Sequence, residues 1–335
     1  MSGFPFAAIV GQDEMKTALL IAAVEPRIGG VMVFGDRGTG KSTAARALAA
    51  LLPPMRVAAG CRFNCDPDRG GCAAGSGDCA AGEVIEVPVP FVDLPLGATE
   101  DRITGALDIE RALVGGEKAF EPGLLARANR GFLYIDEINL LEDHLVDLLL
   151  DVSQSGENLV EREGLSIRHP ARFVLIGSGN PEEGELRPQL LDRFGLAVEV
   201  RSPADLAARV EIMRRCDAHD RDPAGFAARF ADDNRAILDR IAAARAALSG
   251  IAVDEDVLAD AAALCLALGV DGLRGELTLM RAARALAALG GEDHVTRDHI
   301  RAVAPLALRH RLRRNVLDET GSTVRIDRAM AELWP

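Results

Sequence analysis

The chain contains the stretch Gly35-Asp36-Arg37-Gly38-Thr39-Gly40-Lys41-Ser42, which fits the phosphate-binding loop pattern of Gly, four free positions, Gly-Lys and then Ser or Thr. The apolar run 31–34 leads into the loop and the helical run 43–52 leads out, as the motif requires. Glycines let successive backbone N–H groups face phosphate oxygens, and the following helix adds its positive N-terminal end. We therefore expect Lys41 to reach the β- and γ-phosphates and the Ser42 hydroxyl to bind Mg²⁺. The alternative is a plain glycine turn between a core strand and a core helix.

Composition restricts the classes of protein to which this chain can belong. Its 335 residues are enough for two domains, and 48% hydrophobic with 27% charged residues describe a globular protein. The net charge of -13 argues against nucleic-acid binding as the main role. No apolar run approaches the roughly 20 residues of a membrane span, and the N-terminus shows no secretory signal. Because six Cys accompany a nucleotide site, we expect the cytoplasm as the compartment.

A second apolar run, Phe132-Leu133-Tyr134-Ile135, is followed directly by Asp136 and Glu137. This pattern predicts a buried parallel strand that ends in two carboxylates. Ligands of open α/β sheets lie at the carboxyl ends of strands, where the phosphate loop also lies. Asp136 would hold Mg²⁺ through water, and Glu137 would orient and polarise the attacking water. The alternative is a helix N-cap with first-turn acids, but the upstream phosphate loop favours nucleotide hydrolysis.

Three further side chains are candidates for a hydrolytic site. The buried strand predicted at 172–180 ends in Asn180, whose amide could bond the γ-phosphate or hold the water, although Asn-Pro commonly forms a turn. Arg193 is a candidate arginine finger, a residue that neutralises charge developing in the transition state. Arg274 stands at the start of a later helix and could touch a nucleotide. The alternative for Arg193 is an ion pair with Asp192 or another surface acid, and the alternative for Arg274 is an ion pair with Glu276 or an acid in its loop.

The hydrophobic periodicities divide the chain into three parts. They predict an α/β domain with a parallel sheet over residues 1–204, a helical connector over 205–248 and a helical bundle over 249–335. In the connector, a helix at 205–216 is followed by a charged link through Asp233. The expected bundle helices lie at about 254–268, 275–289 and 297–312, with a polar tail after Arg313.

Insertions interrupt the predicted α/β domain. Alternation around Glu163-Gly164 predicts a β-hairpin ahead of the strand that ends in Asn180. The segment 91–102 is too polar and broken for a core element, so we expect residues 93–120 to project from the domain. Short helices are expected near this insertion, at 108–114 and 122–129.

Four cysteines lie in a loop over residues 60–82 that is rich in Gly, Asp and Pro and has no hydrophobic period. They are Cys61, Cys65, Cys72 and Cys79. Four thiols could hold Zn²⁺ in a tetrahedral site, act as a redox switch or stay free. Their spacing of three, six and six intervening residues is not the paired spacing of common zinc ribbons. All three interpretations stay open.

Taken in order, the phosphate loop, the Asp136-Glu137 pair, Asn180, Arg193 and Arg274 resemble the motifs of an AAA+ ATPase. The likeness narrows to the magnesium chelatase subunit I family, through blocks that are more specific than the shared nucleotide motifs. It extends over about residues 4–322. The blocks that carry it are 92–102, 105–113, 120–131, 177–184, 187–195 and 272–278.

This resemblance implies an AAA+ fold, in which a P-loop α/β domain with inserted β-hairpins precedes a C-terminal helical lid. It implies hydrolysis of ATP with Mg²⁺ in a hexameric ring, together with a second subunit, D, and a large porphyrin-binding subunit, H. The subunits would insert Mg²⁺ into protoporphyrin IX for chlorophyll or bacteriochlorophyll synthesis. We expect the insertion to occur on a partner, because this sequence shows no cluster of aromatic residues with an axial ligand.

The resemblance also implies roles for individual residues. Lys41, Asn180 and Glu137 would serve hydrolysis in the subunit's own site, whereas Arg193 would act on a neighbour's nucleotide. The family's lid lies behind the nucleotide, so Arg274 would meet either its own or a neighbouring nucleotide. An apolar segment such as 8–12 covers the adenine base in many related rings. The expected nucleotide-binding residues are Val10, Gly35, Asp36, Arg37, Gly38, Thr39, Gly40, Lys41, Ser42, Thr43, Asp136 and Arg274.

Three other functions fit parts of the pattern. A MoxR-type remodelling ATPase or the small ATPase of a cobalt chelatase shares the core and the hairpins, but the block 92–131 discriminates against both. A DNA motor could carry a similar hairpin, but the net charge of -13 opposes it. A nucleotide-sensing assembly factor with negligible turnover is opposed by the presence of Glu137 and Arg193.

Overall fold

The computed structural model describes residues 3–69, 83–107, 119–162, 165–180, 184, 186–312 and 321–334. At its centre is a five-stranded sheet with the order β11-β1-β10-β7-β4, in which every neighbouring pair is parallel. The strands are β1 (Val31–Gly35), β4 (Phe91–Leu94), β7 (Phe132–Ile135), β10 (Val174–Gly179) and β11 (Leu196–Val200). The parallel sheet and the strands expected after the phosphate loop are confirmed.

Helices cover both faces of this sheet, because successive side chains of a strand point to opposite faces. Val31 and Val33 belong to one buried apolar cluster with the helices α1 (Asp13–Val24) and α2 (Lys41–Leu51). Met32 belongs to a second cluster on the other face. The helices of that face are α5 (Leu124–Ala128) and α6 (Asp143–Ser155). Strands buried on both sides explain the unbroken apolar runs in the sequence.

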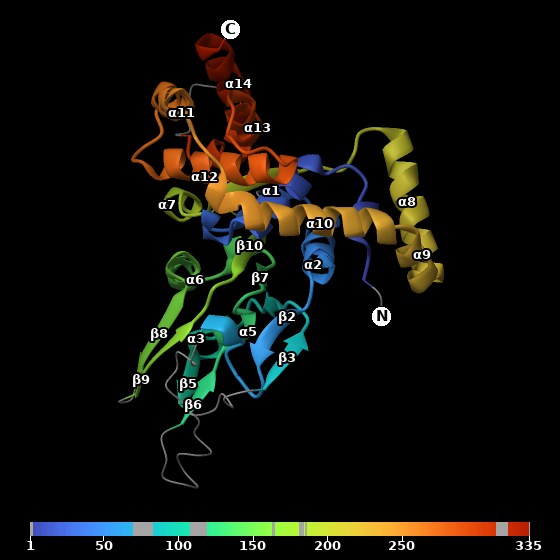
Figure 1. Cartoon of the computed structure of the whole chain (residues 1–335), viewed down its shortest axis with the longest axis vertical. Coiled ribbons are helices and arrows are strands. Elements are labelled where there is room, and N and C mark those ends of the chain that lie inside the picture. Colours follow the sequence, from blue (N-terminus) through green and yellow to red (C-terminus); the bar gives the residue numbers. More distant parts are fainter. Residues whose placement is uncertain are drawn as a thin grey trace.

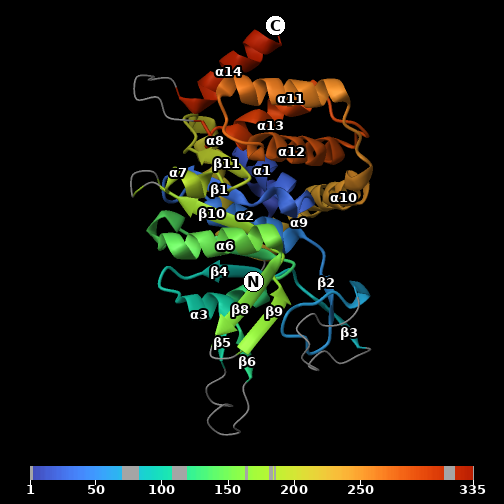
Figure 2. The ribbon, with the colours of Figure 1, turned by 90° about the vertical axis from the view of Figure 1, so that its left-hand side faces the viewer.

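Three two-stranded antiparallel sheets project from the domain. They pair β2 (Met55–Ala58) with β3 (Val84–Val87), β5 (Gly105–Leu107) with β6 (Phe120–Pro122), and β8 (Glu157–Arg162) with β9 (Leu165–Pro170). They gather with α3 (Glu100–Thr104) at the end of the molecule opposite the C-terminal helices (Figures 1 and 2). The hairpin predicted before β10 is confirmed, while its turn residues 163–164 lie outside the described residues.

The part of the chain after β10 is mostly helical, with β11 as its one strand among the described residues. Its helices are α7 (Pro188–Leu191), α8 (Leu206–Arg221), α9 (Pro223–Arg229), α10 (Ala231–Ala247), α11 (Glu255–Leu268), α12 (Arg274–Gly290), α13 (Arg297–Leu308) and α14 (Ser322–Leu333). Figure 1 shows α8 and α9 projecting to one side and α11 to α14 stacked at the C-terminal end. Leu264, Leu279 and Val303 of this bundle share an apolar cluster with Leu19 and Val198 of the sheet domain. The bundle is therefore packed firmly against α1 and β11.

Single turns of 3-10 helix connect several of these elements. They lie at Phe6–Ala8, Pro26–Ile28, Pro67–Arg69, Ile138–Leu140 and Leu248–Gly250.

One sequence interpretation is wrong at the edge of the sheet. Residues 91–94 form β4, a strand of the main sheet, although the segment is too polar to suggest a core element. The reason is that β4 lies at the edge of the sheet. Val92 and Leu94 are buried, while Asp93 points outward and pairs with Arg46 at 2.6 Å. The projecting insertion therefore begins after Leu94 rather than at residue 93.

Two helices were also not expected from the sequence. The tail after Arg313 contains α14, which packs against α11 and buries Ile326. The indole N–H of Trp334 donates to Asp260 of α11 at 3.1 Å. This contact forms only when the helical bundle is folded, so the sequence pattern does not reveal it. The charged link through Asp233 is the end of α8, followed by α9 and the first residues of α10.

One helix in the inserted region begins later than the sequence predicts. The helix expected at 122–129 begins at Leu124, because Pro122 pairs with Gly105 in the small sheet of β5 and β6. The helix expected at 108–114 lies outside the described residues.

Candidate nucleotide-binding and hydrolysis site

The phosphate loop runs from the end of β1 to the first turn of α2 and has the backbone conformation that its glycines permit. Gly40 has φ +83°, in the left-handed region that side chains rarely adopt. Gly35 has φ +148°, and a Cβ there would lie 2.1 Å from the carbonyl oxygen of Val200 on the neighbouring strand β11. The loop can therefore turn tightly against the sheet while its N–H groups and the α2 N-terminus face a phosphate.

Side chains close the loop on itself. The Lys41 ammonium donates hydrogen bonds to the carbonyl oxygens of Gly35 and Asp36, the second at 2.9 Å. The Thr39 hydroxyl donates to the Asp36 carbonyl at 2.8 Å. Gln12 donates from Nε2 to the Thr39 carbonyl at 3.0 Å, so the segment 8–12 with Val10 lies beside the loop. The lysine is thus held at the loop, where a phosphate would replace carbonyls as its partner.

The two strand-end acids are held by neighbouring hydroxyl groups. Ser178 of β10 donates from Oγ to Oδ1 of Asp136 at 2.5 Å and accepts from the backbone N–H of Glu137 at 3.3 Å. The Tyr134 hydroxyl lies 3.2 Å from the same Asp136 oxygen and also contacts the Ser42 hydroxyl. Burial raises the pKa of Tyr134 to about 12, so this phenol stays a proton donor. Asp136 and Ser42, predicted from distant motifs, therefore meet at one tyrosine.

Arg37 and Glu137 form an ion pair that the sequence does not predict. Arg37 Nη2 lies 2.7 Å from Glu137 Oε1, and the side chains are 69% and 18% exposed, respectively. Glu137 has φ +51°, so the backbone turns sharply after β7 and aims this carboxylate toward the phosphate loop. The pair joins the loop directly to the proposed water-orienting residue.

A cleft of about 1280 Å³ opens between the carboxyl ends of the strands and the helical bundle. It brings together predicted residues from the loop, a strand end, the finger segment and the lid. They are Gly35, Asp36, Asn180, Arg193 and Arg274. Residues that are 238 positions apart, Asp36 and Arg274, thus line one space, as expected for a site built at the strand ends.

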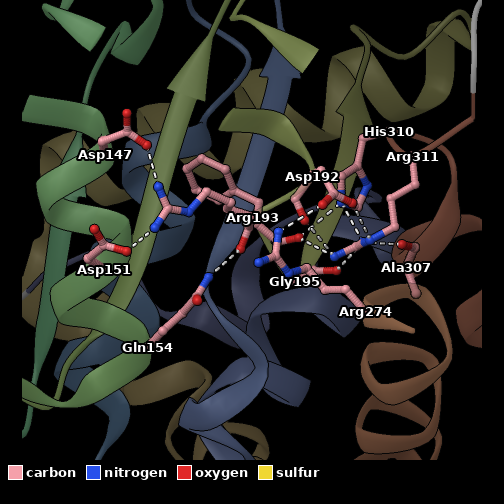
Figure 3. A network of polar contacts seen from close by, with 11 residues as sticks. Asp147, Asp151, Gln154, Asp192, Arg193, Gly195, Arg274, Ala307, His310 and Arg311 are labelled. Carbon is pink, nitrogen blue, oxygen red and sulfur yellow. Dashed lines mark hydrogen bonds and ion pairs between the residues drawn. The ribbon is translucent and has the colours of Figure 1, made fainter. Parts of the chain in front are cut away.

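Arg193 has its charge satisfied within the subunit. Its guanidinium forms ion pairs with Asp147 and Asp151, which are one turn apart on α6. Arg274 turns to the other side of the same segment and pairs with Asp192 at 2.8 Å (Figure 3). Each arginine therefore has an acidic partner within the subunit, and the partner of Arg274 is Asp192, which lies outside the loop that precedes α12.

The residues at this site fit a nucleotide with Mg²⁺. Mg²⁺ is usually held in such sites by one or two protein oxygen ligands together with substrate phosphates. The Ser42 hydroxyl and the Asp136 carboxylate supply oxygen ligands of this kind, and both contact Tyr134. Sequence reasoning missed Tyr134 and Ser178 as site residues, and it named the segment 8–12 without assigning a contact to Gln12. The one available signal is the hydroxyl of Tyr134 within the otherwise apolar strand β7.

Replacing Ser178 with Ala is expected to weaken Mg²⁺ binding with nucleotide. The change removes one hydrogen bond to the Asp136 carboxylate and leaves the Glu137 N–H without its acceptor. A loss of about 1 kcal/mol corresponds to a rise of roughly fivefold in the Mg²⁺ concentration that gives half-maximal ATPase rate. A titration with Mg²⁺ at saturating ATP measures this half-maximal concentration.

The matched control for this prediction is Ser153→Ala. Ser153 is also a buried serine, but its hydroxyl donates to the Leu150 carbonyl within α6. Its Mg²⁺ dependence should equal that of the unchanged protein. An unchanged Mg²⁺ requirement in Ser178→Ala would contradict the role assigned to Ser178.

The cysteine loop is described only in part. Cys65 is buried in a small apolar cluster with Phe63, and its N–H donates to Cys61 Sγ at 3.4 Å. Cys72 and Cys79 lie outside the described residues, so the four-thiol cluster stays a prediction. Within the described part of the chain, no group of three or more His, Cys, Asp or Glu side chains could hold a metal ion.

Together, the parallel sheet, the phosphate loop beside strand-end acids and the helical bundle define an AAA+ ATPase fold. A family model described as AAA lid domain matches residues 258–330, and one described as Magnesium chelatase, subunit ChlI, matches residues 5–62 and 108–190. The chain belongs to the magnesium chelatase subunit I family, as the following relatives show.

Curated relatives match over nearly the whole chain. The "Magnesium-chelatase 38 kDa subunit" of Acidiphilium rubrum is 66% identical, covering 100% of this chain and 98% of the relative. The protein of the same name from Cereibacter sphaeroides is 63% identical, covering 99% of both chains. The "Magnesium-chelatase subunit ChlI-2, chloroplastic" of Arabidopsis thaliana is 52% identical, covering 99% of this chain and 80% of the relative.

Solved structures agree with the family and with the fold. A chain in a complex of subunits BchI and BchD of magnesium chelatase is 61% identical, with a TM-score of 0.58, covering 94% of this chain and 98% of that chain. A putative ATPase from Cytophaga hutchinsonii has a TM-score of 0.66 at 17% identity, covering 97% and 90%, and supports the fold alone. Among the helices of the described residues, none has the length and apolar character to cross a membrane.

Proposed function

We propose that this chain is the ATP-hydrolysing subunit of a magnesium chelatase, which drives insertion of Mg²⁺ into protoporphyrin IX in chlorophyll or bacteriochlorophyll synthesis. One observation carries the proposal. The Asp136–Glu137 pair lies against the phosphate loop through the Arg37–Glu137 contact, in a chain that is 66% identical over its whole length to a magnesium-chelatase subunit. No relative named above favours the alternative of a MoxR-type or cobalt-chelatase ATPase.

The residues of the site divide the work of hydrolysis. When bound, Mg²⁺ neutralises charge on the phosphate oxygens, and Ser42 and Asp136 would hold it. Lys41 leaves the loop carbonyls for the β- and γ-phosphates of ATP. Glu137 orients the water that attacks the γ-phosphorus, while the bond to the β–γ bridging oxygen breaks. Asn180 holds the γ-phosphate or that water from the end of β10.

In this proposal the chain divides into three parts, and its subunits assemble. We assign residues 1–204 to nucleotide binding, 205–248 to the connector and 249–335 to the lid. Arg193 acts on the nucleotide of a neighbouring subunit in a hexameric ring, and the ring works with a D subunit and a porphyrin-binding H subunit. The solved complex of a 61% identical BchI chain with BchD supports a D partner. The cytoplasm stays the expected compartment.

The direct test combines this chain with purified D and H subunits, MgATP and protoporphyrin IX. We expect Mg-protoporphyrin IX to form only when the chain and ATP are both present. The fluorescence of the product monitors its formation. A Lys41→Ala subunit serves as the control that lacks a working loop, and it should give no product. ATP hydrolysis without any metallated porphyrin would contradict the proposed substrate and favour a remodelling ATPase.

A further inference from the structure

The turn that carries Arg193 is held by a buried arginine from the lid. Arg311 follows α13, and its side chain is only 1% exposed. It donates from Nη2 to the carbonyl oxygens of Asp192 and Phe194 at 3.1 and 2.7 Å, and from Nη1 to that of Gly195 at 3.2 Å. Its Nε lies 3.3 Å from the Asp192 carboxylate. One guanidinium thus binds the backbone on both sides of Arg193, at Asp192 and at Phe194 and Gly195.

Holding two segments together with a buried cation carries a large desolvation free energy. Removing a guanidinium from water costs several kcal/mol, and an apolar side chain of the same size often packs equally well. Burial is the main cause that lowers the pKa of Arg311 to about 10, so the group still carries its charge at neutral pH. What the planar fork adds is geometry, because its N–H groups fix three carbonyls at once.

The finger turn is held from two sides (Figure 3). On the lid side, Asp192 receives Arg311 and also Arg274, which begins α12. On the other side, the guanidinium of Arg193 reaches Asp147 and Asp151 of α6. The lid therefore determines where the backbone of the turn lies, and α6 determines where the guanidinium of Arg193 lies.

We propose that Arg311 is a positioning residue for the Arg193 finger, which couples the position of the lid to the position of the finger in a neighbour's site. The proposal rests on the proposed function, in which Arg193 acts across a subunit interface. It predicts that a subunit without Arg311 keeps a working site of its own and fails only as a donor of the finger.

Mixed rings test this prediction. Arg311→Met removes the fork but keeps a side chain of similar length, and we expect it to bind ATP normally while hydrolysis falls about 10²-fold, as a misplaced catalytic group costs. Mixing it with Lys41→Ala subunits should restore hydrolysis, because these subunits have a dead site of their own but an intact finger. Mixing it with Arg193→Ala subunits should restore nothing, because neither subunit then offers a working finger.

Arg309→Met is the matched control. Arg309 is an equally buried arginine at the same helix end, with a side chain 6% exposed, but it bonds Glu14 of α1 at 2.7 Å and the Pro305 carbonyl at 2.9 Å. Any loss in this variant should not depend on which subunit it is mixed with. The same selective rescue in Arg309→Met would assign the effect to general lid packing and overturn the proposal.

The remaining outcomes separate the two proposals. If Arg193→Ala and Lys41→Ala subunits regain activity together but Arg311→Met and Lys41→Ala do not, Arg311 does not act through the finger. If Arg193→Ala and Lys41→Ala gain nothing, the finger does not act across subunits and both proposals fail. Should Arg311→Met not fold, Arg311→Lys takes its place, with a loss of about tenfold and the same rescue pattern, because one ammonium cannot span three carbonyls.

Discussion

A Glu137→Gln subunit is expected to bind ATP as tightly as the unchanged subunit but to hydrolyse it about 10²–10⁴-fold more slowly, the range for loss of a general base. The amide keeps the size of the side chain and removes the negative oxygen that orients and polarises water. The phosphate loop, Ser42 and Asp136 are untouched, so affinity should survive. Equilibrium ATP binding together with steady-state phosphate release measures the two quantities separately.

Glu142→Gln is the control for the same change of charge. Glu142 lies five positions further along the same connection, and its side chain is 77% exposed, with His144 as its partner. Its turnover should be normal. Normal turnover in Glu137→Gln would remove Glu137 from the mechanism, whereas loss of ATP binding would make its contact with Arg37 a binding contact.

In an Arg193→Ala subunit, the rate of ATP hydrolysis is expected to fall about 10³-fold or more, because an arginine finger contributes a rate enhancement of this size. Nucleotide binding to the subunit's own site should persist, because Lys41 and the loop remain. The loss should be seen only where subunits assemble, since an isolated subunit receives no finger from a neighbour. Turnover measured against protein concentration tests this dependence.

Arg187→Ala separates the finger from a general loss of ion pairs. Arg187 also pairs with an acid of α6, Asp143, at 2.7 Å, and it lies on the same segment as Arg193. Exposed pairs of this kind contribute about 0–1 kcal/mol, so its turnover should change little. Equal losses in both variants would show that contact with α6, rather than a finger, is what matters.

The ion pairs of Arg193 have a consequence for the proposed ring. Asp147 and Asp151 compensate the finger's charge before any neighbour is present. Under the proposed function, delivery of the finger exchanges these carboxylates for the phosphates of the neighbouring ATP. Similarly, Glu137 exchanges Arg37 for water when ATP fills the loop. In this proposal, Arg193 and Glu137 are each paired within the subunit until a neighbour or ATP takes the place of the partner.

Misjudged parts of the fold share one physical cause. The polar and broken character of 91–102 hides the strand β4, which as an edge strand needs only one buried face and leaves Asp93 exposed. The helix α14 carries a single fully buried residue, Ile326. Its contacts with α11 stabilise it, and the local sequence pattern does not predict them. Marginal elements of this kind depend on tertiary contacts for their stability.

The sequence by itself determined the class of site, because the phosphate loop is a local device. Its glycines, its lysine and the N-terminus of its helix lie within eight consecutive residues, and the apolar runs that end in Asp136 and Asn180 place two more groups at the same sheet edge. Only the tertiary structure decided the partners of these groups. Ser178 reaches Glu137 across 41 positions, and Arg311 reaches Asp192 across 119. Such pairs depend on strand order and lid packing, which are set by the burial of apolar surface over the whole chain.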